Sequence, residues 1–191
     1  MRITHTRVAS LASAFLLTAL SMAASPAEAR AGTPSRTPTW VDASVRVTGS
    51  AEQDRYEARV LQLTNAARSH SRKCGGKRMR KARALSWSPA LAASAHAHST
   101  DMASNDFFAH TSRSGASPFD RMRAAGYSRH PLTENIAAGL DAPSAVVKAW
   151  LKSPGHCRAI MDRRARELGV GRVEGSGEYG VYWTQDFGAT R

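Results

Sequence analysis

The apolar residues of this chain change their spacing part-way along it, and this change is the feature that most restricts the fold. In the first part they recur every three or four residues, as one face of a helix requires. Two later segments, 167–173 and 179–187, instead alternate apolar side chains with small or polar ones, as strands do. The glycine-rich stretch 174–178 between them indicates a tight turn. Helices followed by a small antiparallel sheet predict an α+β fold.

Serine residues mark the start of several predicted helices. Ser50, with Gln53 three residues later, forms the pattern of a capping box. Three Ser-Pro pairs place a serine cap before a proline that suits the first helical position. These pairs are Ser88-Pro89, Ser117-Pro118 and Ser153-Pro154. A further helix is expected over 143–152, because the next proline forces a break after it.

Residues 1–29 have the three parts of a secretory signal peptide. Arg2 and Arg7 make the start positive, a mostly apolar stretch follows, and Ala-Glu-Ala at 27–29 provides a cleavage pattern. A membrane anchor is the alternative, but serine and threonine interrupt the apolar stretch, which is also short for a span. We therefore expect a secreted, extracellular protein, free or associated with the cell wall, with no stable membrane span.

The chain after this leader is expected to divide at about residue 50. Residues 30–50 are rich in Pro, Thr, Ser and Ala, a composition typical of a linker. The remaining residues, 51–191, have the length of one domain with a proper hydrophobic core. They contain no internal repeat, and we expect a monomer.

The chain has two cysteines, Cys74 and Cys157, which lie 83 positions apart. In an exported protein such a pair most simply forms one disulfide. The chain-entropy model gives a bridge of this span a stabilising effect of about 4–5 kcal/mol. The alternative is a cysteine nucleophile, because Cys157 follows His156 in a predicted first helical turn that would favour a thiolate.

Positive charge is concentrated in one segment of the chain, which has 27 Lys and Arg against 15 Asp and Glu. Eight basic residues fall within 68–83: Arg68, Arg72, Lys73, Lys77, Arg78, Arg80, Lys81 and Arg83. Such a segment suits an anionic extracellular polymer, such as cell-wall teichoic acid, or lipid headgroups. It holds no aromatic residue to stack on bases, so we expect no nucleic-acid partner. The alternative without any ligand is a solvated basic loop.

Four titratable residues lie in separate segments that could line one cleft. They are His110 in Phe107-Phe108-Ala109-His110-Thr111, Glu134 in Glu134-Asn135-Ile136-Ala137, His156 in Ser153-Pro154-Gly155-His156, and Glu167 in Glu167-Leu168-Gly169-Val170-Gly171. Two histidines and two glutamates suit a divalent metal such as zinc, and equally suit general acid/base chemistry. The gaps between them hold no compact metal motif, so separate surface or capping roles are the alternative.

The local structure expected around these residues bears on their chemistry. His156 falls at the third position of a predicted helix, where the helix N-terminus disfavours imidazolium and so favours the neutral, metal-binding form. His110 and Glu134 are expected in loops that follow helices, where site residues often collect. Glu167 is expected to start a strand, and the two glycines that follow it on the same strand face predict open space, as in the floor of a cleft.

Other residues with chemical potential are expected in structural roles. His98 lies on the apolar stripe of its predicted helix, which favours a hydrogen-bonded core histidine. Trp87, Trp150 and Trp183 have apolar neighbours and are expected in the core. Neither a G-x-S-x-G elbow nor an S-x-x-K motif is present, so no serine nucleophile is recognisable.

In their order along the chain, and followed by Tyr182-Trp183-Thr184-Gln185-Asp186-Phe187-Gly188, the four segments resemble the CAP superfamily, also called the SCP or cysteine-rich secretory protein, antigen 5 and pathogenesis-related 1 fold. The resemblance covers about residues 51–188 and points to the short secreted bacterial branch. It implies a three-layer α-β-α sandwich in which helices cover both faces of a small antiparallel sheet. The chain lacks the C-terminal cysteine-rich extension of larger eukaryotic members, so the ion-channel activities tied to that extension are not expected.

The resemblance also implies a shared site, because two histidines and two glutamates line a central cleft in the family. The matching positions here are His110, His156, Glu134 and Glu167. The histidine pair is associated with a divalent metal in several members, zinc being the expected ion, and the glutamates are thought to complete or orient the site. Asn135, Ser153 and Gln185 are then expected as supporting groups.

Three functions are compatible with this sequence. The first is a secreted binding module whose cleft holds a divalent cation and whose targets are extracellular or at the cell wall. The second is a metal-assisted hydrolase of peptide or cell-wall bonds, with Glu134 or Glu167 as the catalytic general base. The third is a carrier of lipid or sterol. Because no nucleophile is recognisable, the binding module is our first expectation, and enzymatic activity is left undecided.

Overall fold

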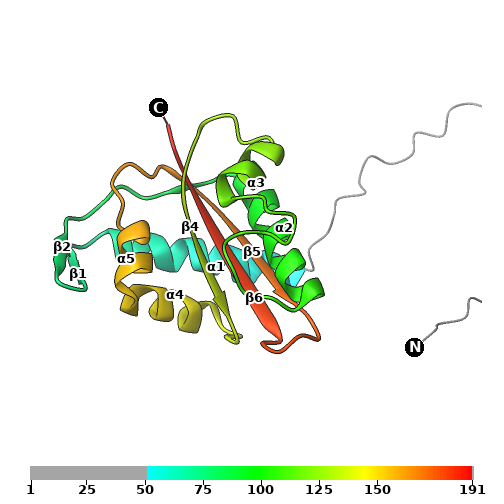
Figure 1. Cartoon of the computed structure of the whole chain (residues 1–191). Coiled ribbons are helices and arrows are strands. Elements are labelled where there is room, and N and C mark those ends of the chain that lie inside the picture. The colour runs from blue at the N-terminus through cyan, green and yellow to red at the C-terminus, as the bar shows by residue number, and fades with distance from the viewer. Residues whose placement is uncertain (1–50, 191) are drawn as a thin grey trace, which may run out of the picture. The chain divides into compact units, whose positions relative to one another are not determined.

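The computed structural model describes residues 51–190, which form the elements labelled in Figure 1. In chain order they are α1 (Ala51–Arg68), β1 (Arg72–Cys74), β2 (Lys77–Met79), β3 (Ser86–Trp87), α2 (Pro89–Asn105), α3 (Pro118–Ala124), β4 (His130–Ala138), α4 (Pro143–Lys152), α5 (Pro154–Ile160), β5 (Glu167–Glu174) and β6 (Val181–Ala189). The predicted signal peptide, the linker and the Ser50 cap lie outside the described residues.

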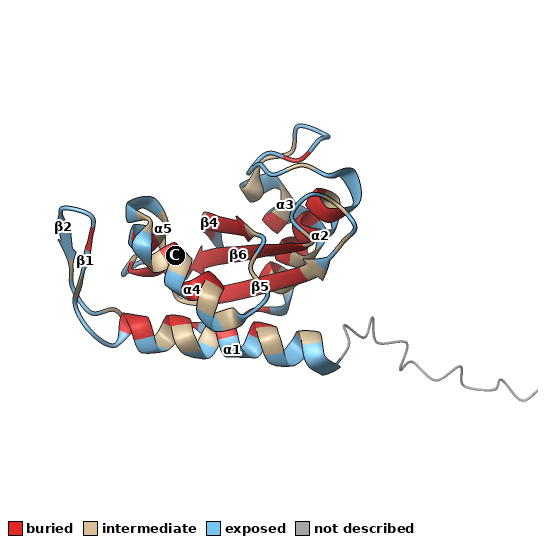
Figure 2. Cartoon of the chain, turned by 90° about the horizontal axis from the view of Figure 1, so that it is seen from below, coloured by how far each residue is buried: buried red, intermediate tan, exposed pale blue. Residues whose placement is uncertain are grey.

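These elements stack in three layers. The central sheet has the strand order β3-β5-β6-β4, in which β4, β5 and β6 run antiparallel. Helices α1, α4 and α5 cover one face of the sheet, and α2 and α3 cover the other (Figure 1 and Figure 2). The α+β sandwich is therefore confirmed, with the two-residue strand β3 added in parallel to β5 at one edge.

Strand β6 lies in the middle of the sheet, and all nine of its residues are buried. Because helices cover both faces of the sheet, alternate side chains of β6 point into two different buried layers, and neither set faces solvent. Trp183 and Phe187 join the main apolar cluster beneath α1 and α4. Thr184 and Asp186 instead accept hydrogen bonds from serines of α2, at 2.9 and 2.7 Å. The face beneath α1 and α4 thus carries the largest apolar cluster, and the face beneath α2 carries smaller apolar clusters together with buried serine hydrogen bonds.

The three tryptophans do not share one environment. Trp150 and Trp183 are fully buried, as expected, and each indole N–H donates to a backbone carbonyl. The expectation for Trp87 was wrong, because its residue is 37% exposed. Trp87 lies on the short edge strand β3, beside a shallow hollow whose other wall is α1. An edge strand of two residues has too few neighbours to bury so large a side chain.

Glycines 169 and 171 of β5 bring α2 against the sheet. A Cβ atom at Gly169 would collide with the backbone nitrogen of Ala92, and one at Gly171 would collide with that of His96. The predicted cleft floor above these glycines is therefore wrong, because helix α2 fills the space. Their role is to permit a close approach of helix and strand backbones.

The two cysteines form a disulfide, with 5.4 Å between the Cα atoms of Cys74 and Cys157. Both residues are fully buried, and the bond joins the β1–β2 hairpin to α5. No free cysteine is left among residues 51–190, which removes the alternative of a cysteine nucleophile.

The three Ser-Pro pairs all begin helices, but their serines differ in what they cap. The hydroxyl of Ser88 accepts a hydrogen bond from the N–H of Leu91, and Ser117 forms a full capping box with Asp120. Ser153 occupies the N-cap position of α5 without a capping hydrogen bond from its side chain. Within the described part of the chain, no helix has the length and apolar character needed to cross a membrane.

Candidate functional site

Glu134 is the centre of a buried polar cluster at the edge of the sheet. It lies within β4 and faces Asp186 of β6 across the ladder, so its predicted place in a loop was wrong. Its side chain is only 1% exposed. A carboxylate so buried needs charged or hydrogen-bonding partners for both oxygens.

Both oxygens of Glu134 have such partners. Nδ1 of His110 lies 2.7 Å from Oε1, and Nη2 of Arg121 lies 2.5 Å from Oε2. With Glu134 as the acceptor, Nδ1 of His110 carries the proton, and a neutral His110 then has its lone pair on Nε2. The His110 side chain is 51% exposed, which leaves the imidazole open to a ligand.

Arg121 of α3 fixes the loop that carries His110. Its Nη1 donates to the carbonyl of His110 at 2.9 Å, the hydroxyl of Ser112 at 3.1 Å and the carbonyl of Ala116 at 3.1 Å. The same guanidinium therefore holds Glu134 and shapes the loop after α2. Arg121 has no signal of its own in the sequence, because nothing distinguishes it from Arg123 of the same short helix.

His156 stands at the third position of α5, as predicted, and lies close to His110. Its pKa is lowered first by burial and then by the neighbouring His110, so the neutral imidazole is favoured. Its backbone carbonyl accepts a hydrogen bond at 3.3 Å from Asn135, which also donates to Gln185 at 3.0 Å. Of the three residues expected as supporting groups, Asn135 therefore contacts the backbone of His156, Gln185 contacts Asn135, and Ser153 is the N-cap residue of the helix that carries His156.

Glu167 starts β5, as predicted, but its bonds are separate from those of Glu134. Its carboxylate accepts a hydrogen bond from the hydroxyl of Tyr127 at 2.7 Å and pairs with Arg129 at 3.2 Å. Burial, and then the hydrogen bond to Glu167, raise the pKa of Tyr127, which keeps this hydroxyl a donor. A side chain at Gly188, opposite Glu167 on β6, would collide with Tyr127. The structure therefore links His110 to Glu134 and places His156 beside them, while Glu167 belongs to a second cluster.

Two further buried groups lie behind Glu134. Asp186 is fully buried and accepts a hydrogen bond from Ser94, and burial followed by the charge of Glu134 raises its pKa well above the usual range. His98 is also fully buried, with Nε2 2.9 Å from the carbonyl of Ala109, so its role as a core histidine is confirmed. Asp186 was visible in the sequence only as a polar position on the last strand.

The profile of the cysteine-rich secretory protein family, CAP, matches residues 61–187. The chain belongs to the CAP family. The uncharacterized protein YkwD of Bacillus subtilis is 41% identical over 132 residues, which make up 69% of this chain and 46% of YkwD. The uncharacterized membrane protein YlbC of the same bacterium is 35% identical over 137 residues, or 71% of this chain and 35% of YlbC. This CAP chain thus spans less than half the length of either relative.

Solved structures of other proteins share the fold. An extracellular protein containing an SCP domain from Bacillus anthracis superposes with a TM-score of 0.60 at 28% identity, over 72% of this chain and 41% of that one. An outer surface protein from Borrelia burgdorferi gives a TM-score of 0.58 at 20% identity, over 75% of this chain and 97% of that one. The second likeness concerns the fold alone.

The four predicted site residues fit a divalent metal only in part. Among residues 51–190, no group of three or more His, Cys, Asp or Glu side chains is placed to hold an ion. Glu134 and Glu167 each form an ion pair with an arginine, so a metal would have to compete with that arginine for either carboxylate. What fits is the pair of imidazoles, His110 and His156, whose nitrogen donors suit zinc. Such a pair requires further ligands from water or from a bound target.

Proposed function

We propose that the CAP domain of this chain is an extracellular binding module whose cleft holds a divalent cation, zinc first, between His110 and His156. The predicted leader and the likeness to an extracellular SCP-domain protein at 28% identity support an extracellular setting. Two protein ligands leave coordination positions for donors of a target, so the cation would join the module to that target. Zinc supplies Lewis acidity and tetrahedral coordination when bound.

The observation that carries this proposal is the hydrogen bond between His110 and Glu134. In protein metal sites a ligating histidine commonly donates its second ring N–H to a carboxylate, which fixes the tautomer and raises the basicity of the ligand. Glu134 makes this contact at 2.7 Å and is itself held by Arg121. His156 adds an imidazole whose pKa is lowered, and a neutral imidazole is the form that binds metal.

The same contacts favour binding over hydrolysis. A general base must be reached by water and must gain a proton readily. The side chain of Glu134 is only 1% exposed and is paired with Arg121, and Glu167 is held by Tyr127 and paired with Arg129, so both carboxylates are stabilised in the ionised form. We therefore give Glu134 the role of orienting His110, and Glu167 the role of holding its own cluster.

Calorimetric titration of zinc into chelator-treated mature protein tests the proposal. We expect one site in the wild type, lost in both His110→Ala and His156→Ala, while His70→Ala, which removes an exposed histidine on the segment between α1 and β1, binds as the wild type does. Thermal melts should show all variants folded and only the wild type and His70→Ala stabilised by zinc. A wild type that takes up no zinc, or a site kept in either cleft variant, would refute it.

A second candidate function, lipid carriage, is favoured by a groove between α1 and α4. The groove has a volume of about 570 Å³, and its apolar residues include Leu63, Val147 and Leu151. Lys148 and Lys152 line it as well, which suits the carboxylate of a fatty acid. Native mass spectrometry and organic extraction of the purified protein should reveal bound fatty acid if this function holds. Absence of lipid, and no uptake of a fluorescent fatty acid, would exclude it.

A further inference from the structure

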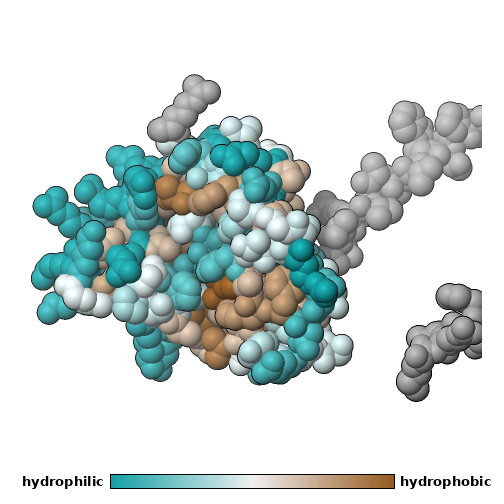
Figure 3. Space-filling view, in the orientation of Figure 1, coloured by the Kyte–Doolittle hydropathy of each residue, from teal (hydrophilic) through white to brown (hydrophobic). Residues whose placement is uncertain are grey.

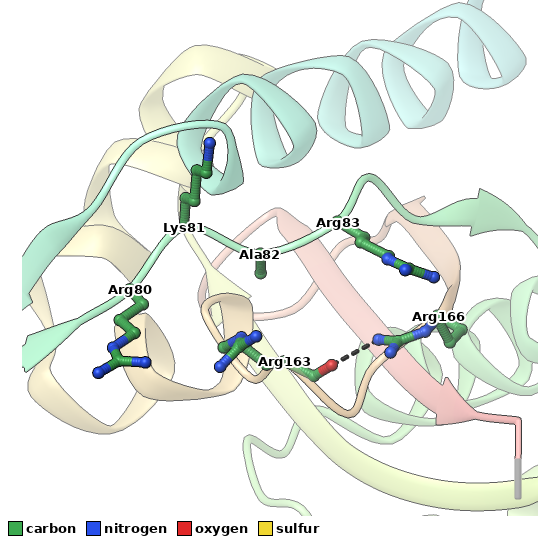
Figure 4. Close-up of a pocket in the computed structure, with 6 residues that line it drawn as sticks. All are labelled: Arg80, Lys81, Ala82, Arg83, Arg163 and Arg166. Atoms are coloured by element: carbon green, nitrogen blue, oxygen red, sulfur yellow. Dashed lines mark hydrogen bonds between the residues drawn. The ribbon is translucent and has the colours of Figure 1, made fainter.

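Two distant segments bring a set of cationic side chains around one hollow. Residues 80–83, between β2 and β3, face residues 163–166, which precede β5 (Figure 4). The hollow has a volume of about 620 Å³ and is lined by Arg80, Lys81, Ala82, Arg83, Arg163 and Arg166. Five of these six residues are cationic and none is acidic. The basic run seen in the sequence supplies only one wall, and the structure adds the second.

These five cations have no neutralising partner within the described residues. None of them forms an ion pair with a carboxylate among residues 51–190. The nearest acidic positions in sequence are already taken, since Asp162 pairs with Arg164 and Glu167 with Arg129. In Figure 4 the guanidinium group of Arg166 points toward the backbone carbonyl of Arg163, to which it donates a hydrogen bond, and not toward a carboxylate. Like charges placed together without a counter-charge create a strong positive potential that attracts anions.

A buried arginine holds together the two segments that line the hollow. Arg68, at the end of α1, is fully buried and donates to the carbonyls of Arg83, Ile160, Asp162 and Ala165, at 2.7, 2.6, 2.9 and 3.2 Å. One guanidinium thus ties both walls of the hollow to the same helix end. A surface held in this way loses little conformational entropy when it binds a ligand.

A second hollow of about 390 Å³ adjoins the first and shares Arg80 and Arg163 with it. It adds Lys77, Arg78, Arg158 and Arg164, and its one acidic residue is Asp162. The disulfide keeps its walls together, because the bond joins the β1–β2 hairpin to α5. Figure 3 shows hydrophilic side chains gathered over this side of the molecule. We call the cationic residues of both hollows the arginine surface.

We propose that the arginine surface binds a polymer of repeating phosphate diesters. Guanidinium groups match phosphate oxygens with two parallel hydrogen bonds. Two adjoining hollows with shared arginines suit successive phosphates better than a single ion. Neither hollow is lined by an aromatic residue, so nucleic-acid bases have no stacking platform. Nor do the exposed large apolar residues of the described chain line either hollow, so a lipid bilayer finds no anchor there.

This surface is separate from the histidine cleft, and its function does not depend on a metal. No residue of the cleft lines either hollow. The two sites can therefore fail or succeed independently in experiment.

Binding of poly(glycerol phosphate) to the full mature protein, measured by calorimetry at several salt concentrations, tests the proposal. The variant Arg80→Ala/Arg163→Ala removes the two shared arginines, both exposed. The matched control is Arg55→Ala/Arg59→Ala, which removes two exposed charges from α1. We expect the first variant to lose about tenfold in affinity. Its plot of log K against log[salt] should also be less steep than that of the wild type, by about 2. The control should lose less than about twofold.

Three results would overturn the proposal. The first is no binding by the wild type, and the second is an equal loss in both double variants, which would indicate a net-charge effect only. The third is tighter binding, by more than about tenfold, of single-stranded DNA or of phosphatidylglycerol vesicles, which would assign the surface to another partner. Thermal melts confirm that the variants are folded, which is expected because both pairs are exposed.

Discussion

Two arginines hold irregular backbone in this fold: Arg68, which is fully buried, and Arg121, whose side chain is 9% exposed. Arg68 donates to carbonyls 15 to 97 positions away in sequence, and Arg121 donates to carbonyls 5 and 11 positions away. They differ in their counter-charge. Arg121 is paired with the buried carboxylate of Glu134, whereas every hydrogen bond recorded for the Arg68 side chain ends on a backbone carbonyl.

This difference decides what the surface above each arginine can bind. At the cleft the charges of Arg121 and Glu134 balance, and the exposed groups are imidazoles with nitrogen donors. At the arginine surface Asp162, which pairs with Arg164, is the one acidic residue that lines the two hollows, so most of the positive charge is unbalanced. Burial, followed by repulsion from Arg166, lowers the pKa of Arg68 to about 10, and the charge of Asp162 opposes this shift. Carbonyl groups satisfy the N–H donors of Arg68 and so fix the loop, but they do not cancel its charge. The positive potential of this surface therefore remains available to attract an anion.

The largest expected effect concerns the disulfide, which joins the β1–β2 hairpin to α5, the helix that also carries His156. Replacing both Cys74 and Cys157 by Ala should lower the free energy of unfolding by about 4 kcal/mol, because the bridge restricts the unfolded chain over 83 positions. Urea unfolding measures this loss. The zinc affinity of the cleft should stay unchanged in the folded variant, and a parallel loss of zinc binding would show that the two sites are coupled.

The next effect comes from Arg68→Met. Four carbonyls lose their donor, so the free energy of unfolding should fall by roughly 4 kcal/mol. Arg59→Met, on the exposed side of α1, is the control and should change it by less than about 0.5 kcal/mol. Adding Asp162→Asn to Arg68→Met should bring no recovery, because Arg68 contacts the carbonyl of Asp162 and not its carboxylate. Recovery would contradict the distinction drawn between the two arginines.

Arg121→Met should cost about 3 kcal/mol, because it leaves the Glu134 carboxylate buried without its cation. In this case the partner matters, so Glu134→Gln should recover part of the loss in the double variant. A double-mutant cycle by urea unfolding measures the coupling, which we expect to exceed about 1 kcal/mol. Additive effects would mean that Arg121, like Arg68, does not depend on a carboxylate partner.

The smallest effect concerns Glu57, a buried carboxyl whose main partner is a backbone N–H, that of Arg172 at 3.0 Å. Burial raises its pKa from 4.5 to about 7. Because the folded pKa lies above the unfolded one, this group lowers stability progressively as pH rises from about 4.5 to 7. Glu57→Gln should therefore stabilise the protein by about 2 kcal/mol at pH 8 and by nothing at pH 4. Thermal melts at the two pH values check this, and a gain that is equal at both would refute the ionic explanation.

Much of the fold was predictable because its signals are local. The Ser-Pro pairs located the starts of α2, α3 and α5, and the alternation of apolar residues located β5 and β6. Strand β4 was missed, since its sequence of proline, asparagine and alanine has little intrinsic strand character and becomes a strand by pairing with β6. Gly169 and Gly171 indicated that one face of β5 has no side chains at these positions, but the sequence did not show that the backbone of α2 occupies the space.

The candidate site was predictable in its members more than in its connections. The ordered motifs identified His110 and Glu134, which the structure joins by a hydrogen bond, and His156, which interacts electrostatically with His110. The same motifs placed Glu167 with them, yet the structure joins it to Tyr127 and Arg129 instead. Arg121 and Asp186, which surround Glu134, had no signal of their own. Side-chain partners across three elements depend on packing that spacing along the chain does not record.

The sequence by itself determined the family, the positions of most helices and of the last two strands, the disulfide pair and the presence of a strongly basic segment, because periodicity, caps and composition act locally or are countable. Only the tertiary structure decided which charges meet. It paired Arg121 with Glu134, left Arg68 with carbonyls alone, and set Arg163 and Arg166 opposite Arg80 and Arg83. Electrostatic interactions depend on distance in space, and helices that fold back on a sheet bring together charges that lie 80 or more positions apart in the chain.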